Sequence, residues 1–238
     1  MPPTIVLVHG AFADSASWDH VIDLLPTDCR VIAAANPLRG LASDAESVSD
    51  LVRSIDGPVL LVAHSYGGAV ISNVAADAGD ITGLVYVCGF APDSGEHCFQ
   101  LAGMFPGSMV GEETVRPVPR SDGTTDFYIA PESFHDVFCA DVAAPQAALM
   151  AATQRPATQE ALTEPTEGRP LWKDVPSWFA IGEQDRIIPA ALQRYEAERA
   201  GARRVVELAG ASHAAAVSQP GAVAKLIVAA AMTVPAAA

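Results

Sequence analysis

The sequence predicts an α/β domain built around a mostly parallel β-sheet. Six short runs of aliphatic and β-branched residues recur along the chain, at 4–8, 30–34, 59–63, 81–87, 177–181 and 204–208. These runs lack the polar alternation of a half-exposed strand, which favours strands covered on both faces, as in a parallel sheet. Helical stretches separate the runs, and this alternation is typical of right-handed strand-helix-strand crossovers.

Local signals indicate where the helices begin and end. A helix is predicted over 43–55, because the Ser-Asp-Ala-Glu run at the start of this range has the spacing of a capping box. An Ala-rich helix is expected over 68–78. A third, over 189–200, begins at a proline and is followed by a glycine, and a fourth, over 220–231, is apolar throughout. Residues 233–238 are expected to form a frayed tail.

One long segment, residues 93–174, breaks the strand-helix rhythm. It holds five of the eight phenylalanines, and its 13 acidic and 5 basic residues carry −8 of the chain's net charge of −14. Long irregular segments are usually functional or disordered, and the aromatic content argues against disorder. We therefore expect a core domain formed by residues 1–92 and 175–238, with 93–174 inserted as a cap over a site in the core. A small packed subdomain without a role in substrate binding is the alternative.

Composition narrows the classes of function. Half of the 238 residues are apolar, only 18% are charged and the mean hydropathy is +0.24, so the chain can bury a large core and is not disordered. The net charge of −14 disfavours nucleic acids and acidic membrane surfaces as partners. No signal peptide is visible before the first apolar run and no run is long enough to cross a bilayer, so a cytoplasmic protein is expected.

Four cysteines, at positions 29, 88, 98 and 139, are too far apart for a C-x-x-C pair or for zinc-ligand spacing. We expect reduced thiols that pack as small hydrophobic side chains. A disulfide or a reactive thiol at Cys98 is the alternative.

The most informative stretch joins a strand to a helix through a serine. An apolar run over 59–63 leads to Ser65, and two glycines at 67 and 68 open the next helix. This order is typical of a nucleophile elbow, in which a sharp, strained turn exposes the serine oxygen. The turn needs small residues two positions before and after the serine, and here these are Ala63, in place of the usual glycine, and Gly67. A serine in an ordinary loop is the alternative.

Acyl transfer also needs hydrogen-bond donors for the developing oxyanion. The backbone N–H of Tyr66, directly after the serine, is one candidate. The loop His9-Gly10-Ala11-Phe12 after the first strand should supply the other, because Gly10 permits an unusual backbone conformation. We assign this second donor to Ala11, with Phe12 as the less favoured choice. The ring of His9 is expected to brace the loop through a hydrogen bond.

A histidine oriented by a carboxylate must activate the serine. Of the six histidines, His213 follows the last strand and so emerges at the carboxyl edge of the sheet, the same edge as Ser65. Asp185 follows the fifth strand at that edge and lies between the serine and the histidine in chain order, as expected for the acid. Asp93 and Glu183 are the alternatives for the acid.

Motifs spread over the whole chain point to one family. They are His9-Gly10-Ala11-Phe12, Trp18, Ala63-His64-Ser65-Tyr66-Gly67-Gly68, Gly182-Glu183-Gln184-Asp185, Ile188-Pro189 and Gly210-Ala211-Ser212-His213. Together they resemble the α/β-hydrolase superfamily, and more closely its small single-domain branch of plant methylesterases, hydroxynitrile lyases and bacterial esterase-like proteins. The resemblance implies the α/β-hydrolase fold: a mostly parallel six-stranded sheet with helices on both faces and a cap inserted after the fourth strand.

Some residues depart from individual members of that superfamily. The cyanohydrin lyases of this branch carry Thr after the first His and Lys after the catalytic His, where this chain has Gly10 and Ala214, so lyase chemistry is disfavoured. Ser65 argues against epoxide hydrolases and dehalogenases, which use an Asp nucleophile. A perhydrolase, a cofactor-free dioxygenase of the same fold and a ligand-binding protein with a vestigial triad stay open.

The sequence therefore predicts a serine esterase or lactonase with Ser65, His213 and Asp185 as its catalytic triad. The substrate is expected to be a small, largely apolar carboxylic ester or lactone, hydrolysed through an acyl-enzyme. The candidate pocket residues are Phe12, Phe90, Phe105, Phe127, Tyr128, Phe134, Phe138 and Met150. Neither a cofactor nor a metal is expected, and the chain should act as a monomer or homodimer.

Overall fold

A fully parallel six-stranded sheet forms the centre of the computed structural model, which describes residues 2–233. Its strands are β1 (Thr4–Val8), β2 (Val31–Ala34), β3 (Pro58–Ser65), β4 (Asp80–Gly89), β8 (Ser177–Gly182) and β9 (Arg204–Leu208). They lie in the order β2-β1-β3-β4-β8-β9, and every neighbouring pair is parallel. All six predicted strands are confirmed, whereas the tail expected at 233–238 lies almost wholly outside the described residues.

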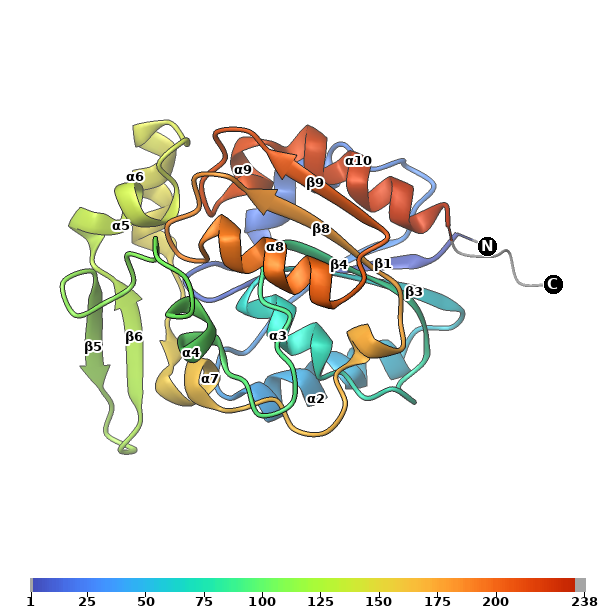
Figure 1. Ribbon diagram of the computed structural model, residues 1–238, viewed down its shortest axis with the longest axis horizontal. Coiled ribbons are helices and arrows are strands. Elements are labelled where there is room, and N and C mark those ends of the chain that lie inside the picture. The colour runs from blue at the N-terminus through green and yellow to red at the C-terminus, as the bar shows by residue number, and fades with distance from the viewer. Residues whose placement is uncertain (1, 234–238) are drawn as a thin grey trace.

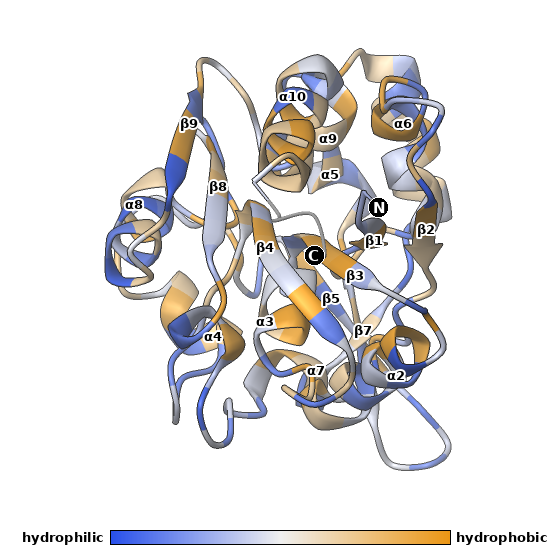
Figure 2. Ribbon diagram, turned by 90° about the vertical axis from the view of Figure 1, so that its right-hand side faces the viewer, coloured by the Kyte–Doolittle hydropathy of each residue, from blue (hydrophilic) through white to orange (hydrophobic). Residues whose placement is uncertain are grey.

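Helices cover both faces of this sheet (Figure 1). They are η1 (Ser15–Trp18), α1 (Asp19–Ile22), α2 (Leu41–Arg53), α3 (Tyr66–Ser72), α8 (Ala190–Arg199), α9 (Ala215–Ser218) and α10 (Pro220–Ala231). Val6 of β1 packs in a core cluster with residues of α2, α3 and α8, whereas the adjacent Leu7 packs in a second cluster with residues of α1, α9 and α10. The four inner strands β1, β3, β4 and β8 are buried on both faces over most of their length, which explains why their sequences show no alternation. The edge strands β2 and β9 are partly exposed. Figure 2 shows hydrophobic residues along the central β3 and β4.

The start of α2 differs from the prediction. The helix begins at Leu41, two residues before the predicted capping box, because Ser43 Oγ donates back to the Gly40 carbonyl and does not accept from a helix amide. The carboxylate of Glu164, from the inserted segment, instead accepts from the Ala42 N–H at 3.1 Å. The capping-box prediction was therefore wrong, since a distant residue completes this helix end.

Most of residues 93–174 form a layer at one end of the sheet, and residues 164–174 run back along the core to the start of β8 (Figure 1). The layer contains α4 (Cys98–Ala102), β5 (Val115–Pro119), β6 (Thr125–Ile129), α5 (Pro131–Phe138), α6 (Ala144–Thr153), β7 (Ala157–Thr158) and α7 (Gln159–Thr163), and the returning chain contains η2 (Leu171–Lys173). Its strands form a small antiparallel sheet in the order β5-β6-β7. In Figure 1 the arrowheads of β8 and β9 point toward this layer, so the carboxyl edge of the parallel sheet faces it.

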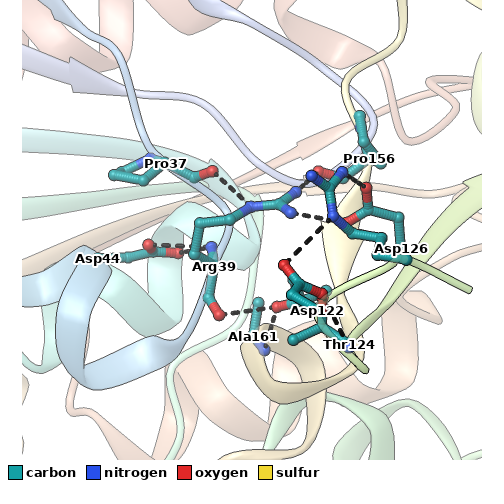
Figure 3. A network of polar contacts seen from close by, with 10 residues as sticks. Pro37, Arg39, Asp44, Asp122, Thr124, Asp126, Pro156 and Ala161 are labelled. Carbon is teal, nitrogen blue, oxygen red and sulfur yellow. Dashed lines mark hydrogen bonds and ion pairs between the residues drawn. The ribbon is translucent and has the colours of Figure 1, made fainter.

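A network of charged side chains fastens the inserted segment to the core (Figure 3). Arg39, in the loop after β2, donates to Asp126 of β6 at 2.6 Å and to the Pro156 carbonyl at 2.9 Å. The Asp126 carboxylate also accepts a hydrogen bond from Arg120 at 2.8 Å, and only 3% of the Asp126 side chain is exposed. Burial by itself raises the pKa of Asp126, but the hydrogen bonds from Arg120 and Arg39 outweigh burial and lower that pKa. The carboxylate therefore stays ionised and joins β6 to a core loop.

No helix within residues 2–233 has the length and apolar character needed to cross a bilayer.

Candidate active site

Ser65 occupies the sharp turn between β3 and α3. Its φ of 56° and ψ of −128° lie in a region that residues with a side chain rarely adopt, at a cost of about 1–3 kcal/mol. The turn is this abrupt because β3 ends at Ser65 and α3 begins at the next residue, Tyr66. The backbone conformation is the one expected for a nucleophile elbow, and it leaves Ser65 lining a cavity.

Two glycines make room for this turn. A Cβ on Gly10 would lie 2.4 Å from Ser65 Cβ, and a Cβ on Gly67 would lie 2.6 Å from the Val8 carbonyl oxygen. Real Cβ atoms do not approach other atoms so closely, so a side chain at either position would displace the backbone. The nearest neighbours of Gly67 are backbone atoms of Val8, at the end of β1, and of His9 after it, and not of Ala63. The small residue is therefore needed here for contact between the elbow and the end of the adjacent strand.

Asp185 and His213 form a buried pair beyond the ends of β8 and β9. His213 Nδ1 and Asp185 Oδ2 are 2.8 Å apart, and neither side chain is exposed. Asp185 Oδ1 accepts from the amides of Ile187 and Ile188 at 2.8 and 2.9 Å. Gln193 Nε2 donates to Asp185 Oδ2 at 2.8 Å. The carboxylate is thus fixed by four hydrogen bonds, and it orients the imidazole by accepting a hydrogen bond from Nδ1–H.

The other ring nitrogen of His213, Nε2, is buried and has no hydrogen-bond partner within residues 2–233. Ser65 Oγ is therefore not hydrogen bonded to it in this structure. In unliganded enzymes this contact is often long and tightens only when substrate binds. A buried polar atom without a partner is uncommon in proteins, and here its lone pair is free to accept a proton.

His64, near the end of β3, braces His213. Its Nε2 donates to the His213 carbonyl at 2.9 Å, and the centroids of the two rings are 4.6 Å apart. Burial, and then the proximity of His213, lower the pKa of His64 well below its usual value. His64 therefore stays neutral and can hold the His213 backbone without placing a second positive charge beside the ring.

The loop after β1 is held by His9. Its Nδ1 donates to the Gly10 carbonyl at 2.9 Å, and its Nε2 accepts from the Asn36 amide at 3.1 Å. Asn36 Nδ2 in turn donates to the His9 carbonyl at 2.9 Å. Burial lowers the pKa of His9, so the ring stays neutral. The predicted bracing of this loop by the His9 ring is confirmed.

Two backbone amides are available beside Ser65, at Ala11 and Tyr66, and both residues line the same cavity as the serine. Tyr66 is the first residue of α3, so its N–H has no acceptor within the helix. Within residues 2–233 no backbone carbonyl accepts a hydrogen bond from the Ala11 N–H. The N–H of Phe12, the less favoured donor, is engaged by the Arg155 carbonyl at 3.0 Å. Ala11 and Tyr66 are therefore the amides that remain free for an oxyanion.

A largely apolar cavity of about 530 Å³ opens beside Ser65. The core contributes Ala11, Phe12, Tyr66, Phe90 and Ile187 to its wall. The inserted segment contributes ten residues, among them Phe99, Glu112, Val115, Phe127 and Leu162. Glu112 is the one charged residue of this lining. The volume falls in the roughly 300–1,000 Å³ range of small-molecule sites. Most of the wall thus comes from residues 93–174.

Three of the eight predicted pocket residues line this cavity, namely Phe12, Phe90 and Phe127. Phe134 and Phe138 lie outside it, because they are buried in a stack with ring centroids 4.9 Å apart. Phe138 instead packs edge-on against His213 at 5.0 Å, where it shields the imidazole.

The other three predicted pocket residues also lie outside the cavity. Phe105 packs beside Tyr195, with ring centroids 5.9 Å apart. Tyr128 follows Phe127 on β6, and successive strand residues point to opposite faces. Met150 lines a different cavity, described below. The prediction for these residues is corrected, because their placement depends on how the inserted segment folds.

The alternative acids do not reach His213. Asp93 forms an ion pair with Lys173 at 2.5 Å, and the Glu183 carboxylate accepts from the Gly210 amide at 3.3 Å. Of the three carboxylates considered, only Asp185 contacts the imidazole.

All four cysteines are free, and Cys88, Cys98 and Cys139 are buried. Burial is the main cause that raises the pKa of each of these three thiols, which keeps them protonated. Cys98 lines the cavity as an inert apolar side chain. Residues 2–233 contain no group of three or more His, Cys, Asp or Glu side chains arranged to hold a metal ion.

Comparisons with known proteins agree with this architecture. A model of the alpha/beta hydrolase family matches residues 5–226. A pyrethroid hydrolase from Sphingobium wenxiniae is 29% identical, over 94% of this chain and 85% of its own. Polyneuridine aldehyde esterase superposes with a TM-score of 0.80 at 20% identity, covering 96% of this chain and 99% of its own. An extracellular α/β-hydrolase from a Paenibacillus species gives 0.79 at 23% identity, with the same coverage. At these identities the structural likeness speaks for the fold.

Proposed function

Because the chain belongs to the alpha/beta hydrolase family, we propose that it is a serine esterase acting on a small, largely apolar carboxylic ester or lactone. The observation that carries this proposal is the buried Asp185–His213 pair, at the same sheet edge as the strained Ser65 and its apolar cavity. Relatives named as a hydrolase and as an esterase support the same class of reaction.

Acylation begins when Ser65 Oγ attacks the ester carbonyl carbon and His213 Nε2 takes the serine proton. Asp185 holds the Nδ1 proton and stabilises the imidazolium that forms. His213 then returns a proton from Nε2 to the leaving alcohol as the C–O bond breaks. The product of this half-reaction is an acyl ester on Ser65 Oγ.

The amides of Ala11 and Tyr66 stabilise the negative charge that develops on the carbonyl oxygen. Each such donor contributes on the order of 3 kcal/mol to the transition state. The braced His9 loop and the start of α3 hold these donors in place before substrate arrives. Their energetic contribution is therefore not reduced by reorganisation during the reaction.

Deacylation repeats these steps with water as the nucleophile. His213 Nε2 removes a proton from water, the resulting hydroxide attacks the acyl carbon, and the proton returns to Ser65 Oγ as the carboxylic acid leaves. The neutral His64 keeps the imidazole in position during both half-reactions.

The cavity favours uncharged substrates. Its lining is largely apolar, and Glu112 is its one charged residue. The negative charge of Glu112 disfavours an ester that also carries a free carboxylate. An alkyl or aryl ester fits this surface better than a phosphorylated or dicarboxylic one.

Hydrolysis of p-nitrophenyl acetate and butyrate by the wild type and Ser65→Ala tests the proposal. The wild type should turn over both esters, and the variant should lose about 10⁴-fold or more in kcat while its melting temperature is kept. Ser94→Ala removes an exposed hydroxyl outside the site and should retain full activity. Equal turnover by Ser65→Ala and the wild type would exclude Ser65 as the nucleophile.

A further inference from the structure

Phe12 lines two cavities. One is the cavity of about 530 Å³ that contains Ser65. The other has a volume of about 330 Å³ and is lined mainly by residues of the 12–14 loop, η1, α1 and α6. Phe12 is the one residue that these two linings share. It is buried, so it forms part of a wall and is not a side chain free in solvent.

The backbone around Phe12 fixes this wall. Its φ is 62°, a strained value, and its N–H donates to the Arg155 carbonyl at 3.0 Å. The neighbouring Gln154 lines the second cavity and exchanges hydrogen bonds of 2.9 and 3.0 Å with the backbone of Ile129 on β6. Two residues before Ile129, Phe127 lines the first cavity. The Phe12 side chain is thus the part of the wall that can be removed without breaking a hydrogen bond.

The second cavity has an apolar side and a polar side. Leu149 and Met150 from α6 and Val217 from α9 form the apolar side, whereas the polar side is formed by Asp14, Ser17, Asp19, His20, Gln146, Thr153 and Gln154. The carboxylates of Asp14 and Asp19, which also line it, would repel an anionic group. An uncharged alkyl or aryl group can therefore pack against the side formed by Leu149, Met150 and Val217, although this cavity is more polar than the first.

We infer that Phe12 is a specificity-determining residue that sets the upper size of the substrate. Its ring separates the cavity beside Ser65 from the second cavity, so the ester must fit within the first. Without the ring, an alkyl or aryl chain on the ester extends into the second cavity. This inference rests on the proposed esterase function, because it concerns the substrate of the same site.

The test compares p-nitrophenyl esters from acetate to dodecanoate on the wild type and on Phe12→Ala. Alanine retains a Cβ, so the backbone strain at position 12 is the same in both proteins. The ratio of kcat/KM for dodecanoate to that for acetate should rise about 10-fold or more in Phe12→Ala, since each buried methylene contributes to discrimination.

A second substitution identifies where the added chain goes. Met150→Trp fills part of the second cavity, so it should abolish the gain of Phe12→Ala in the double variant and leave the wild-type ratio unchanged. Phe99→Ala is the matched control, because Phe99 lines only the first cavity and is 56% exposed. Any gain in Phe99→Ala should persist when Met150→Trp is added.

An unchanged ratio in well-folded Phe12→Ala, or a gain that survives Met150→Trp, would overturn the inference. If no variant hydrolyses any ester, the proposed function fails, and binding of 2-tridecanone by calorimetry then tests the partition by itself. Phe12→Ala should bind this long ketone about 10-fold more tightly than either the wild type or the double variant. Equal binding by all three proteins contradicts the partition.

Discussion

Three side chains in the proposed site are fixed by three different devices. Ser65 is held by a backbone turn with positive φ, and Asp185 is held by four hydrogen bonds. His213 is held on one side by Asp185 and on its backbone by the neutral His64. All three devices act on the protein before substrate binds, as preorganised catalysis requires.

Asp185→Asn tests the orienting role at this scale. The NH₂ group of Asn can donate a hydrogen bond to Nδ1, which favours the imidazole tautomer with its proton on Nε2. In that tautomer Nε2 cannot accept the serine proton, so kcat should fall about 10³- to 10⁴-fold. Ester hydrolysis measures the loss of activity, and thermal melting measures any loss of stability. Glu183→Gln, at the alternative acid, should keep wild-type activity. A larger loss in Glu183→Gln than in Asp185→Asn would reverse the assignment.

Residues that follow strand ends could be located from sequence, and residues of the inserted segment could not. The parallel sheet brings its carboxyl ends to one edge, so the meeting of Asp185 and His213 follows from the order of strands. Cavity-lining residues depend instead on how 93–174 packs. Phe138 therefore covers His213, whereas Glu112, which no pattern marks, lines the cavity.

At the scale of elements, α8 carries an acid whose burial should affect the stability of the protein. Glu196 is completely buried, with one carboxylate oxygen accepting from the Ala91 amide at 3.0 Å and the other, Oε2, without a partner among the described residues. Burial raises the pKa of Glu196 to about 8, although the Ala91 hydrogen bond and the nearby Arg199 oppose this shift. Glu196 is therefore protonated in the folded protein near neutral pH.

The sign of the resulting pH dependence follows from proton binding. Between the usual glutamate pKa of 4.5 and about 8, the folded state keeps a proton that the unfolded state releases. The contribution of Glu196 to the free energy of unfolding therefore falls as pH rises through this window. Glu196→Gln keeps an acceptor for the Ala91 amide but does not titrate. Its stability relative to the wild type should increase by roughly 4 kcal/mol from pH 5 to pH 8.

Urea unfolding at both pH values measures this difference. Glu198→Gln makes the same change at an exposed position of α8 and serves as the matched control. A Glu196→Gln effect that is equal at pH 5 and pH 8 would show that the buried carboxyl does not titrate in this window.

Element boundaries were predictable where the signals are local. α10 occupies the predicted residues 220–231 because its proline start and apolar sequence are contiguous. The start of α2 depends on Glu164, which is distant in sequence, so the local capping-box pattern gave the wrong residue.

At the scale of the whole molecule, the site lies between the core and the inserted segment, which hydrogen bonds and ion pairs join at several places. The core provides Ser65, Asp185 and His213, and the inserted segment provides most of the cavity wall. Arg39 connects the two by binding Asp126 and the Pro156 carbonyl (Figure 3). This connection helps to position the small β5-β6-β7 sheet, which carries Phe127, together with the hydrogen bonds from Thr158 of β7 to the Leu38 and Arg39 carbonyls.

Arg39→Ala should loosen that sheet with little effect on the core. Asp126 keeps Arg120 as a partner, so the expected cost in stability is only about 1 kcal/mol. KM for p-nitrophenyl butyrate should rise several-fold with kcat nearly unchanged, and limited proteolysis should cleave faster near the exposed turn at 120–124. Arg116→Ala is the matched control, because its ion pair with Glu132 lies wholly within the inserted segment. Identical behaviour of the two variants would contradict the role of Arg39.

Covalent labelling decides whether Ser65 is an activated nucleophile. A fluorophosphonate probe should add once to the wild-type protein, the adduct should map to the peptide containing Ser65, and Ser65→Ala should take none. Intact mass and peptide mapping read this result without knowledge of the native substrate. A wild-type protein that takes no adduct, or an adduct that persists in Ser65→Ala, would contradict Ser65 as the activated nucleophile.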